Sequence, residues 1–285
     1  MSTISSNIKC HKIEGIWFII ESKIKENYVL ANGINTYYVE QGAGYPIILL
    51  HGGMGTANGF QNLIPELAKK FQVIAPDCRG HGKSDNPSGE FSYKLMADDI
   101  AEFIKILKLE RPLICGVSDG GQIAFELALN YSELIKAIIV TGVLIEISED
   151  YIKNSMEGGL IKPGVVDFTQ FEKMLGDFLP IFSKAYSPVY GPDYWKTFVQ
   201  EMSKVWLNPK EFPREKIKDI TLPVLNVQGD RDNLIPIEEA LRIYRLIPHS
   251  ELAVAPNSVH IFPHTNWELF LALISDFLQR NGKND

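Results

Sequence analysis

The chain has 285 residues, of which 45% are hydrophobic and 22% are charged. This composition supports a large buried core and excludes an intrinsically disordered chain. The 35 Asp and Glu residues outnumber the 28 Lys and Arg residues, for a formal net charge of -7, so we expect no nucleic acid as a partner.

The cysteines and the first apolar run exclude further classes of protein. Cys10, Cys78 and Cys115 are an odd number at long spacings, which argues against a disulfide framework or a zinc site. The apolar run at 16–20 is too short to span a membrane and lacks a signal-peptide cleavage site. We therefore expect a cytoplasmic protein with no membrane partner, in which residues 1–27 form an N-terminal extension packed on the domain surface as a short strand or helix.

Strand patterns begin directly after this extension. Asn32 and Gly33 separate two β-prone runs at 28–31 and 34–40, which is typical of a hairpin. The next three runs are continuously aliphatic, as expected for parallel strands that helices cover on both faces. These runs lie at 46–50, 71–75 and 113–117.

Helices and strands then alternate along the chain. The spacing of apolar residues predicts helices at 93–107 and 120–130. Thr265 with Glu268 forms a capping-box pattern for a last helix that ends near 280. The sequence therefore predicts an α/β fold with a mostly parallel central sheet, helices on both faces, and ligands at the carboxyl ends of the strands. The other predicted elements are strands at 135–140, 224–227 and 251–255 and a helix after Pro236.

The segment 145–218 interrupts this alternation. It has no aliphatic strand run, but its aromatic residues recur at helical spacing. We predict a helical cap inserted over the strand ends of a core domain formed by 28–144 and 219–285. Most of the aromatic residues are expected to be buried helix faces, whereas Phe178 and Trp206 are expected to contact a bound small molecule. The set is Phe168, Phe171, Phe178, Phe182, Tyr194, Trp195, Phe198 and Trp206.

The string Gly116-Val117-Ser118-Asp119-Gly120 lies between a predicted strand and a predicted helix. A serine on such a sharp turn takes a strained backbone conformation that projects its hydroxyl, and glycines beside it let neighbouring backbone approach. The amino end of the helix favours negative charge that develops at the serine. This context predicts a nucleophile elbow with Ser118 as the nucleophile.

A serine nucleophile needs a histidine base that a carboxylate orients, and in this fold the acid precedes the histidine in the chain. In the loop after the strand at 224–227, Asp232 is favoured as the acid because it lies deeper in the loop. Asp230 is the alternative acid, but it is less favoured because its position suits a turn residue or the partner of an arginine. His260 follows the last predicted strand at the carboxyl end of the sheet and is favoured as the base, with His264 as the alternative.

Acyl transfer also needs two backbone N–H groups that stabilise the oxyanion of the tetrahedral intermediate. One is expected at Asp119, directly after the nucleophile. The other is expected in the glycine-rich turn that begins at His51, with Gly53 as the favoured donor and Met54 as the second choice. His51 itself is expected to hold this turn by hydrogen bonds.

Taken together, these motifs resemble the α/β-hydrolase superfamily, and specifically its serine hydrolases with a helical cap. The resemblance covers the chain from about 28 to 280. It implies the α/β-hydrolase fold and supports Asp232 as the acid, since the family's acid lies three residues after a glycine. The matching motifs are the turn at 51–55, the segment 77–84 that is similar to D-x-R-G-x-G-x-S, the Ser118 string, Gly229-x-x-Asp232, and His260.

Three positions qualify the resemblance. The family often has glycine where Val259 precedes His260, and proline where Met54 stands. The string that places Asp119 beside the nucleophile is similar to that of valacyclovir hydrolase-like enzymes. In those enzymes the corresponding acidic residue receives a substrate ammonium group. By that resemblance an amino-acid ester is a candidate substrate; the alternative is that Asp119 turns away and pairs with a structural donor.

The identity of the nucleophile narrows the reaction. Members of the superfamily that open epoxides or displace halide carry aspartate at the elbow, whereas Ser118 favours acyl transfer. We predict a serine hydrolase that cleaves a small, largely apolar carboxylic ester through an acyl-enzyme, with no cofactor and no metal. C–C bond cleavage, amide hydrolysis, perhydrolase or lyase chemistry, and a non-catalytic ligand receptor remain alternatives.

Overall fold

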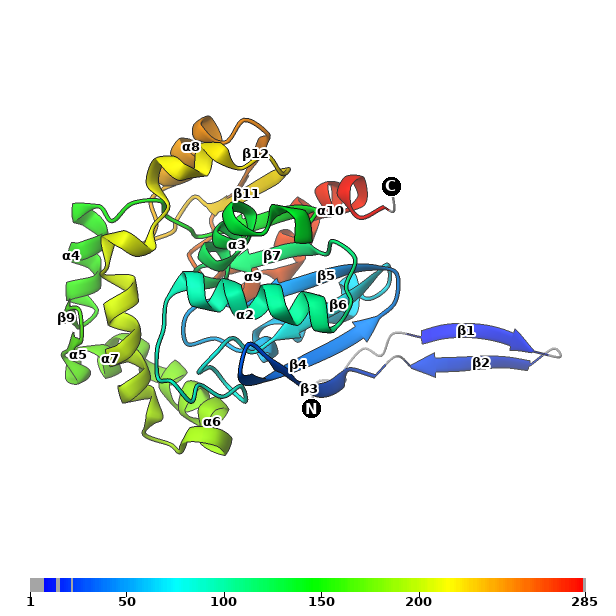
Figure 1. Cartoon of the computed structure of the whole chain (residues 1–285), viewed down its shortest axis with the longest axis horizontal. Coiled ribbons are helices and arrows are strands. Elements are labelled where there is room, and N and C mark those ends of the chain that lie inside the picture. Colours follow the sequence, from blue (N-terminus) through cyan, green and yellow to red (C-terminus); the bar gives the residue numbers. More distant parts are fainter. Residues whose placement is uncertain (1–7, 14–15, 22, 284–285) are drawn as a thin grey trace.

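The computed structural model describes residues 8–13, 16–21 and 23–283, with side chains from residue 23 onward. Its centre is an eight-stranded sheet whose strands follow in the chain as β3 (Lys25–Ala31), β4 (Ile34–Gly42), β5 (Tyr45–Leu50), β6 (Phe71–Pro76), β7 (Leu113–Val117), β8 (Ala137–Thr141), β11 (Val224–Gly229) and β12 (Ser250–Ala255). Their spatial order is β12-β11-β8-β7-β5-β6-β4-β3 (Figure 1). The pairs from β12 to β6 are parallel, and β4 pairs antiparallel with β6 and with β3. The predicted α/β-hydrolase fold with a mostly parallel sheet is confirmed.

The first hairpin of the sheet turns where the sequence predicts it. Asn32 and Gly33 both have positive φ, 47° and 76°, which the two central residues of a type I′ turn require. Strand β3 begins at Lys25, so the sheet starts three residues earlier than the predicted domain boundary at residue 28.

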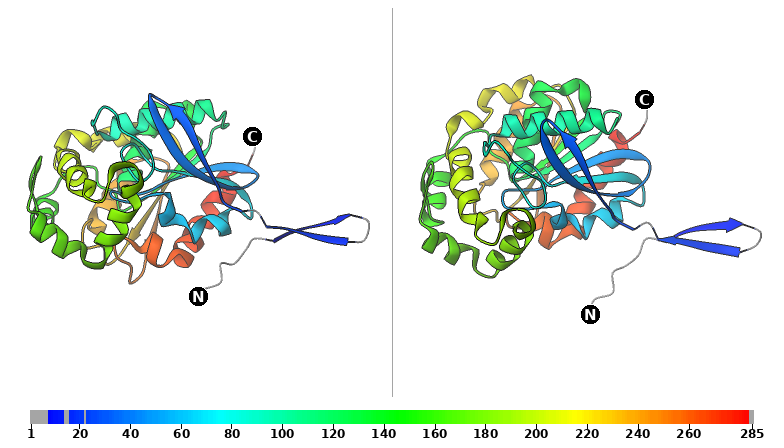
Figure 2. Two further views of the ribbon diagram at one scale, coloured as in Figure 1. Left: turned by 90° about the horizontal axis from the view of Figure 1, so that it is seen from below. Right: turned by 60° about the horizontal axis from the view of Figure 1, so that its bottom comes forward.

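The N-terminal segment differs from the expectation that it packs on the domain surface. Strands β1 (Ile8–Ile13) and β2 (Ile16–Glu21) pair antiparallel as a separate two-stranded sheet. Figures 1 and 2 show this hairpin projecting away from the large sheet. The two strands satisfy backbone hydrogen bonds with each other and so need no pairing with the core. The rest of the predicted extension lies partly outside the described residues.

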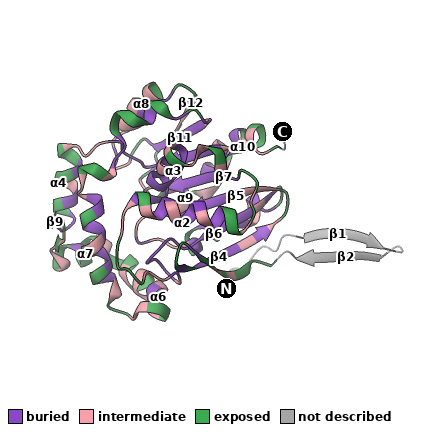
Figure 3. Ribbon diagram, viewed as in Figure 1, coloured by how far each residue is buried: buried purple, intermediate pink, exposed green. Residues whose placement is uncertain are grey.

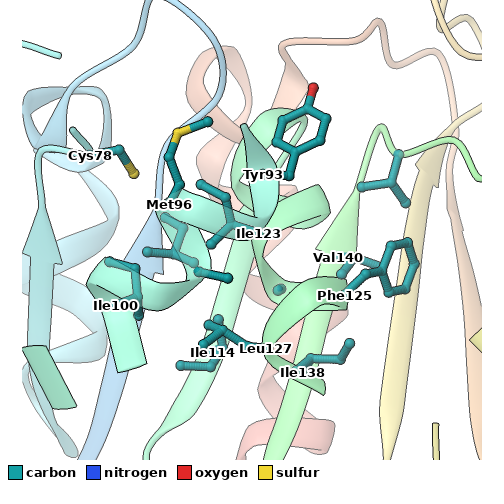
Figure 4. Close-up of a cluster of buried hydrophobic side chains, with 14 of the residues drawn as sticks. Cys78, Tyr93, Met96, Ile100, Ile114, Ile123, Phe125, Leu127, Ile138 and Val140 are labelled. Carbon is teal, nitrogen blue, oxygen red and sulfur yellow. The ribbon is translucent and has the colours of Figure 1, made fainter. Parts of the chain in front are cut away.

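Helices cover both faces of the sheet. One face carries α2 (Tyr93–Ile106), α3 (Asp119–Asn130) and α8 (Ile237–Leu246), and the other carries α1 (Leu63–Leu67), α9 (Phe262–Thr265) and α10 (Trp267–Asn281). In β5, Ile48 and Leu50 face the first layer while Ile47 and Leu49 face the second, and all four are fully buried. Figure 4 shows the first layer, where Ile100 of α2 and Ile123 of α3 lie over the sheet. This two-sided burial explains the continuous aliphatic runs.

The cap of the last helix differs from the prediction. Thr265 is the final residue of α9, and the side chain of Asn266 instead accepts a hydrogen bond from the N–H of Leu269. The predicted capping box of Thr265 and Glu268 is therefore wrong by one residue. The sequence pattern was misleading because the short helix α9 ends immediately before α10, and Asn is as good an N-cap as Thr.

Residues 145–218 consist mainly of helices, as predicted, and lie at the end of the molecule away from the β1–β2 hairpin (Figure 2). The segment also contains two short strands beyond the predicted helices: β9 (Leu160–Lys162) and β10 (Val165–Val166) form a small hairpin around Pro163 and Gly164. Strands this short carry no readable alternation, but a Pro-Gly pair is a turn signal that could have indicated them. The helices are α4 (Glu149–Glu157), α5 (Phe168–Leu175), α6 (Leu179–Tyr190) and α7 (Tyr194–Trp206).

Short 3-10 helices complete the connections, and burial follows the layers. Figure 3 shows buried strands at the centre and exposed outer helix faces. Within the described ranges, every helix is too short or too polar to cross a lipid bilayer. The 3-10 helices are η1 (Ala57–Phe60), η2 (Ser132–Leu134), η3 (Gly176–Phe178), η4 (Pro209–Glu211) and η5 (Arg214–Asp219).

Candidate active site

Ser118 occupies a sharp turn between β7 and α3 with φ 53° and ψ -116°. This is a strained conformation for a residue with a side chain. Two glycines make it sterically feasible: a Cβ atom on Gly116 would lie 2.2 Å from the carbonyl oxygen of Gly120, and one on Gly120 would lie 2.2 Å from that of Leu50. The carbonyl oxygen of Ser118 accepts hydrogen bonds from the first turn of α3. The turn is therefore held by backbone contacts that do not involve the Ser118 hydroxyl.

The structure brings the three favoured residues together from three separate loops. Ser118 Oγ lies 3.1 Å from Nε2 of His260, and Nδ1 of His260 lies 2.8 Å from Oδ2 of Asp232. His260 follows β12 and Asp232 follows β11, so both come from the carboxyl ends of strands beside β8 and β7. The Asp232 side chain is 2% exposed and that of His260 is 15% exposed. This is the geometry that a Ser-His-Asp triad requires.

Hydrogen bonds keep Asp232 ionised. Burial alone would raise its pKa, but the hydrogen bond and charge of His260 and the N–H groups of Leu234 and Ile235 outweigh burial and lower it. Gln228 also donates to Oδ2, at 3.1 Å. An ionised Asp232 accepts a hydrogen bond from the Nδ1–H group of His260, so that Nε2 is left to accept the Ser118 proton.

The alternative acid and base lie elsewhere. Asp230 accepts a hydrogen bond from the N–H of Ser258 and so ties the loop after β11 to the loop that carries His260. His264 lies in α9, where Nδ1 is 3.0 Å from the carbonyl oxygen of Gly59. Each has a structural partner, and the structure does not place either in the hydrogen-bond chain from Ser118.

The predicted oxyanion turn lies against the nucleophile. The N–H of Gly55 donates to the carbonyl oxygen of Gly52, which closes a turn over Gly53 and Met54, and Met54 has a φ of 58°. A Cβ atom on Gly52 would lie 3.2 Å from Cβ of Ser118. Within residues 23–283, the N–H groups of Gly53 and Met54 donate to no protein oxygen. The turn thus presents free donors beside the serine.

His51 holds this turn, as expected. Its Nδ1 lies 2.8 Å from the carbonyl oxygen of Gly52, and its Nε2 accepts a hydrogen bond from the N–H of Cys78. Burial lowers the pKa of His51 to about 4. A neutral imidazole with both nitrogens engaged is a structural group and is not available as a catalytic base.

The carboxylate of Asp119 has two structural donors and is 7% exposed. Its Oδ1 accepts from the hydroxyl of Tyr93 in α2, and its Oδ2 accepts from Nε1 of Trp206 in α7, each at 2.8 Å. Burial raises the pKa of Asp119, although both donors act to lower it. This geometry favours the structural alternative for Asp119. Tyr93 had no sequence signal beyond its place on a buried helix face.

The two predicted contacts from the cap have different outcomes. Trp206 lies against the nucleophile elbow through its bond to Asp119. Phe178 lies at the end of η3 and is 50% exposed. The structure therefore does not place Phe178 in a buried wall around Ser118. Helical spacing could not separate the two residues, because it says which face of a helix is apolar and not which helix lies over the site.

Replacing Asp119 by asparagine is expected to change how stability depends on pH. Because the folded carboxyl has a raised pKa, the folded state keeps a proton that the unfolded chain has lost, so this group makes stability fall as pH rises from the ordinary value of 3.8 through the folded pKa. An asparagine amide does not titrate, so Asp119→Asn gains stability relative to the original chain as pH rises from 4 to 7. Urea unfolding at both pH values measures this; an equal difference at the two pH values would contradict it.

The described residues contain no group of three or more His, Cys, Asp or Glu side chains arranged to hold a metal ion.

Comparisons with known proteins agree with this architecture. The family model described as alpha/beta hydrolase fold matches residues 45–173. The chain is 28% identical to 2-hydroxy-6-oxo-6-(2'-aminophenyl)hexa-2,4-dienoic acid hydrolase of Metapseudomonas resinovorans, over 95% of this chain and 97% of the relative. It is 27% identical to human serine hydrolase BPHL, over 88% and 85% of the two chains.

A solved structure shows the same fold. A thermophilic esterase from Thermogutta terrifontis superposes with a TM-score of 0.71 and 22% identity, over 91% of this chain and all of that one. The parallel sheet, the serine at the strand-to-helix turn after β7 and the similarity to whole-length hydrolases agree. The family model and the whole-length relatives support a hydrolase of the α/β-hydrolase superfamily.

Proposed function

We propose that the protein is a serine hydrolase of small, largely apolar carboxylic esters and that it acts through an acyl-enzyme on Ser118. The observation that carries this proposal is the hydrogen-bond chain from Ser118 Oγ through His260 to Asp232, with distances of 3.1 and 2.8 Å. Free N–H groups in the turn at Gly53 and at Asp119 supply candidate oxyanion donors.

Each step of the reaction has a group to perform it. Ser118 Oγ forms a bond to the ester carbonyl carbon while Nε2 of His260 takes the serine proton. The bond to the alcohol oxygen breaks, and His260 gives its proton to this leaving group. Water then attacks the acyl carbon, His260 takes a proton from it, and Ser118 regains its hydroxyl as the acid leaves. Asp232 stabilises the positive charge on His260 in both halves.

The N–H groups of Gly53 and Asp119 are proposed to bind the oxyanion in both tetrahedral intermediates. Gly53 is the proposed donor from the turn, and its backbone lies beside the Asp119 side chain: a Cβ atom on Gly53 would lie 2.7 Å from Oδ2 of Asp119. Donors at such a site stabilise charge that develops only in the transition state.

C–C bond hydrolysis is a second candidate, because a relative that matches nearly the whole chain is named as a hydrolase of a hexadienoic acid. Such substrates carry a carboxylate. In this chain, both hydrogen-bond donors on Asp119 are neutral, so an ionised Asp119 beside the nucleophile would repel a second anion. This contact favours the neutral ester.

Steady-state kinetics separate the two candidates. We expect p-nitrophenyl butyrate to be hydrolysed with a kcat/KM at least about 100-fold above that for 2-hydroxy-6-oxo-2,4-heptadienoate, since discrimination of this size corresponds to an unfavourable charge contact. A higher kcat/KM for the dienoate would overturn the ester assignment. Turnover of neither substrate, with no binding of inhibitors, would favour a non-catalytic receptor.

A further inference from the structure

The two residues that carry the proposed oxyanion donors, Gly53 and Asp119, both lie against one side chain of the cap, Trp206. Nε1 of Trp206 donates to Oδ2 of Asp119 at 2.8 Å. A Cβ atom on Gly53 would lie 2.9 Å from Cζ2 of the same indole ring and 2.7 Å from the same carboxylate oxygen. The contact set therefore consists of Trp206, Asp119 and Gly53. Within it, the Trp206 indole packs on the Gly53 backbone and donates a hydrogen bond to the Asp119 carboxylate.

This contact set joins the cap to the core. Trp206 is the last residue of α7 and is 9% exposed, and the centroid of its ring lies 6.4 Å from that of Phe198. On the other side, Tyr93 of α2 donates to Oδ1 of Asp119. The Asp119 carboxylate is thus held by one donor from the core and one from the cap. Asp119 is also the first residue of α3, so its backbone N–H lies at the amino end of that helix.

The turn at Gly53 needs such support. Met54 holds a positive φ of 58°, which is unfavourable for a residue with a side chain. Strained turns persist only where the surroundings hold them in place. The Trp206 ring is one of these surroundings, because it closes the space beside Gly53.

We propose that Trp206 is a positioning residue of the oxyanion hole, which it acts on through Asp119 and Gly53 and not through contact with the substrate. This inference rests on the proposed function. It replaces the expectation that Trp206 binds substrate, and it makes the docked cap helix α7 part of the catalytic geometry. An oxyanion donor displaced by a fraction of an ångström stabilises the transition state less while ground-state binding is unaffected.

The test is Trp206→Phe, which keeps an aromatic ring and removes the N–H group. We expect kcat for p-nitrophenyl butyrate to fall about 10- to 100-fold while KM stays within about twofold. A trifluoromethyl ketone forms a hemiketal oxyanion with the serine, so its Ki should rise by the same factor as kcat/KM falls.

The same helix offers a matched control. Trp195→Phe is the same substitution in α7, at a buried residue whose ring contacts Phe168 and Phe171 in the cap. It should leave kcat and the Ki of the ketone within about twofold of the original values. A loss of cap stability alone would affect both variants.

A double-mutant cycle tests whether Trp206 acts through Asp119. Asp119→Ala should itself lower kcat, and adding Trp206→Phe to it should lower kcat by less than about twofold further, because the shared contact is already lost. Fully multiplicative losses would contradict action through Asp119.

Other results overturn the inference in recognisable ways. A rise in KM with unchanged kcat would show that Trp206 contacts substrate. A fall in kcat with an unchanged Ki for the ketone would show a structural role only. If the original chain neither hydrolyses the ester nor binds the ketone, the proposed function fails, and this inference fails with it.

Discussion

Replacing Ser118 or His260 by alanine should each lower kcat for an ester substrate by about 10⁴-fold or more, because the nucleophile and its base act as one unit. The double variant should be no slower than either single variant, since each replacement alone already stops proton transfer from the serine. Pre-steady-state and steady-state ester hydrolysis measure this. Independent losses that multiply in the double variant would contradict a shared mechanism.

Stability provides the control for this prediction. Ser118 sits at φ 53° with no side-chain cap hydrogen bond to α3, so Ser118→Ala removes no structural contact of that kind. Its free energy of unfolding should lie within about 1 kcal/mol of the original chain. Inactive but equally stable Ser118→Ala protein therefore separates a chemical role from a folding defect.

The second large effect is expected at Gly120, where a side chain has no space. In Gly120→Ala the added Cβ would lie 2.2 Å from the carbonyl oxygen of Leu50 and 2.7 Å from that of His51, both of which are backbone atoms at the end of β5. Helix α3 must move away from the sheet, and we expect a loss of at least about 3 kcal/mol in the free energy of unfolding. Activity falls with it, because Ser118 and Asp119 precede this residue directly. Urea unfolding measures the loss.

Gly59→Ala is the matched control, because a side chain added there has more space. A Cβ on Gly59 would lie 3.2 Å from Cε1 of His264, which is a side-chain atom that can shift. Gly59→Ala should therefore cost less than about 1 kcal/mol. Equal stability of the Gly120→Ala and Gly59→Ala variants would contradict the close approach of α3 to β5.

Much of the fold was readable because its signals are local. The aliphatic runs, the Asn32-Gly33 turn and the glycines around Ser118 each reflect a constraint within a few residues of themselves. The β-α alternation then predicts parallel strands, and because β7, β11 and β12 run parallel in one sheet, their carboxyl ends lie at the same end of it. This is why Ser118, Asp232 and His260 could be proposed as a group from the sequence.

The errors arise where tertiary contacts choose between equivalent local patterns. Thr265 and Asn266 are both good helix caps, and the adjoining helix α9 decides in favour of Asn266. Phe178 and Trp206 both belong to sets of aromatic residues at helical spacing, so the sequence pattern does not distinguish them. The packing of α7 on the core brings Trp206 to Asp119. The Tyr93 bond to Asp119 spans 26 residues and has no local signal at all.

The central claim is that Ser118 is an activated nucleophile, and intact-protein mass spectrometry after treatment with a fluorophosphonate tests it most directly. We expect one adduct, mapped to Ser118, that is absent from Ser118→Ala and from His260→Ala. Asp232→Asn should label much more slowly, since His260 loses the carboxylate that orients it. An unlabelled original chain, or an adduct on another residue, would contradict the account.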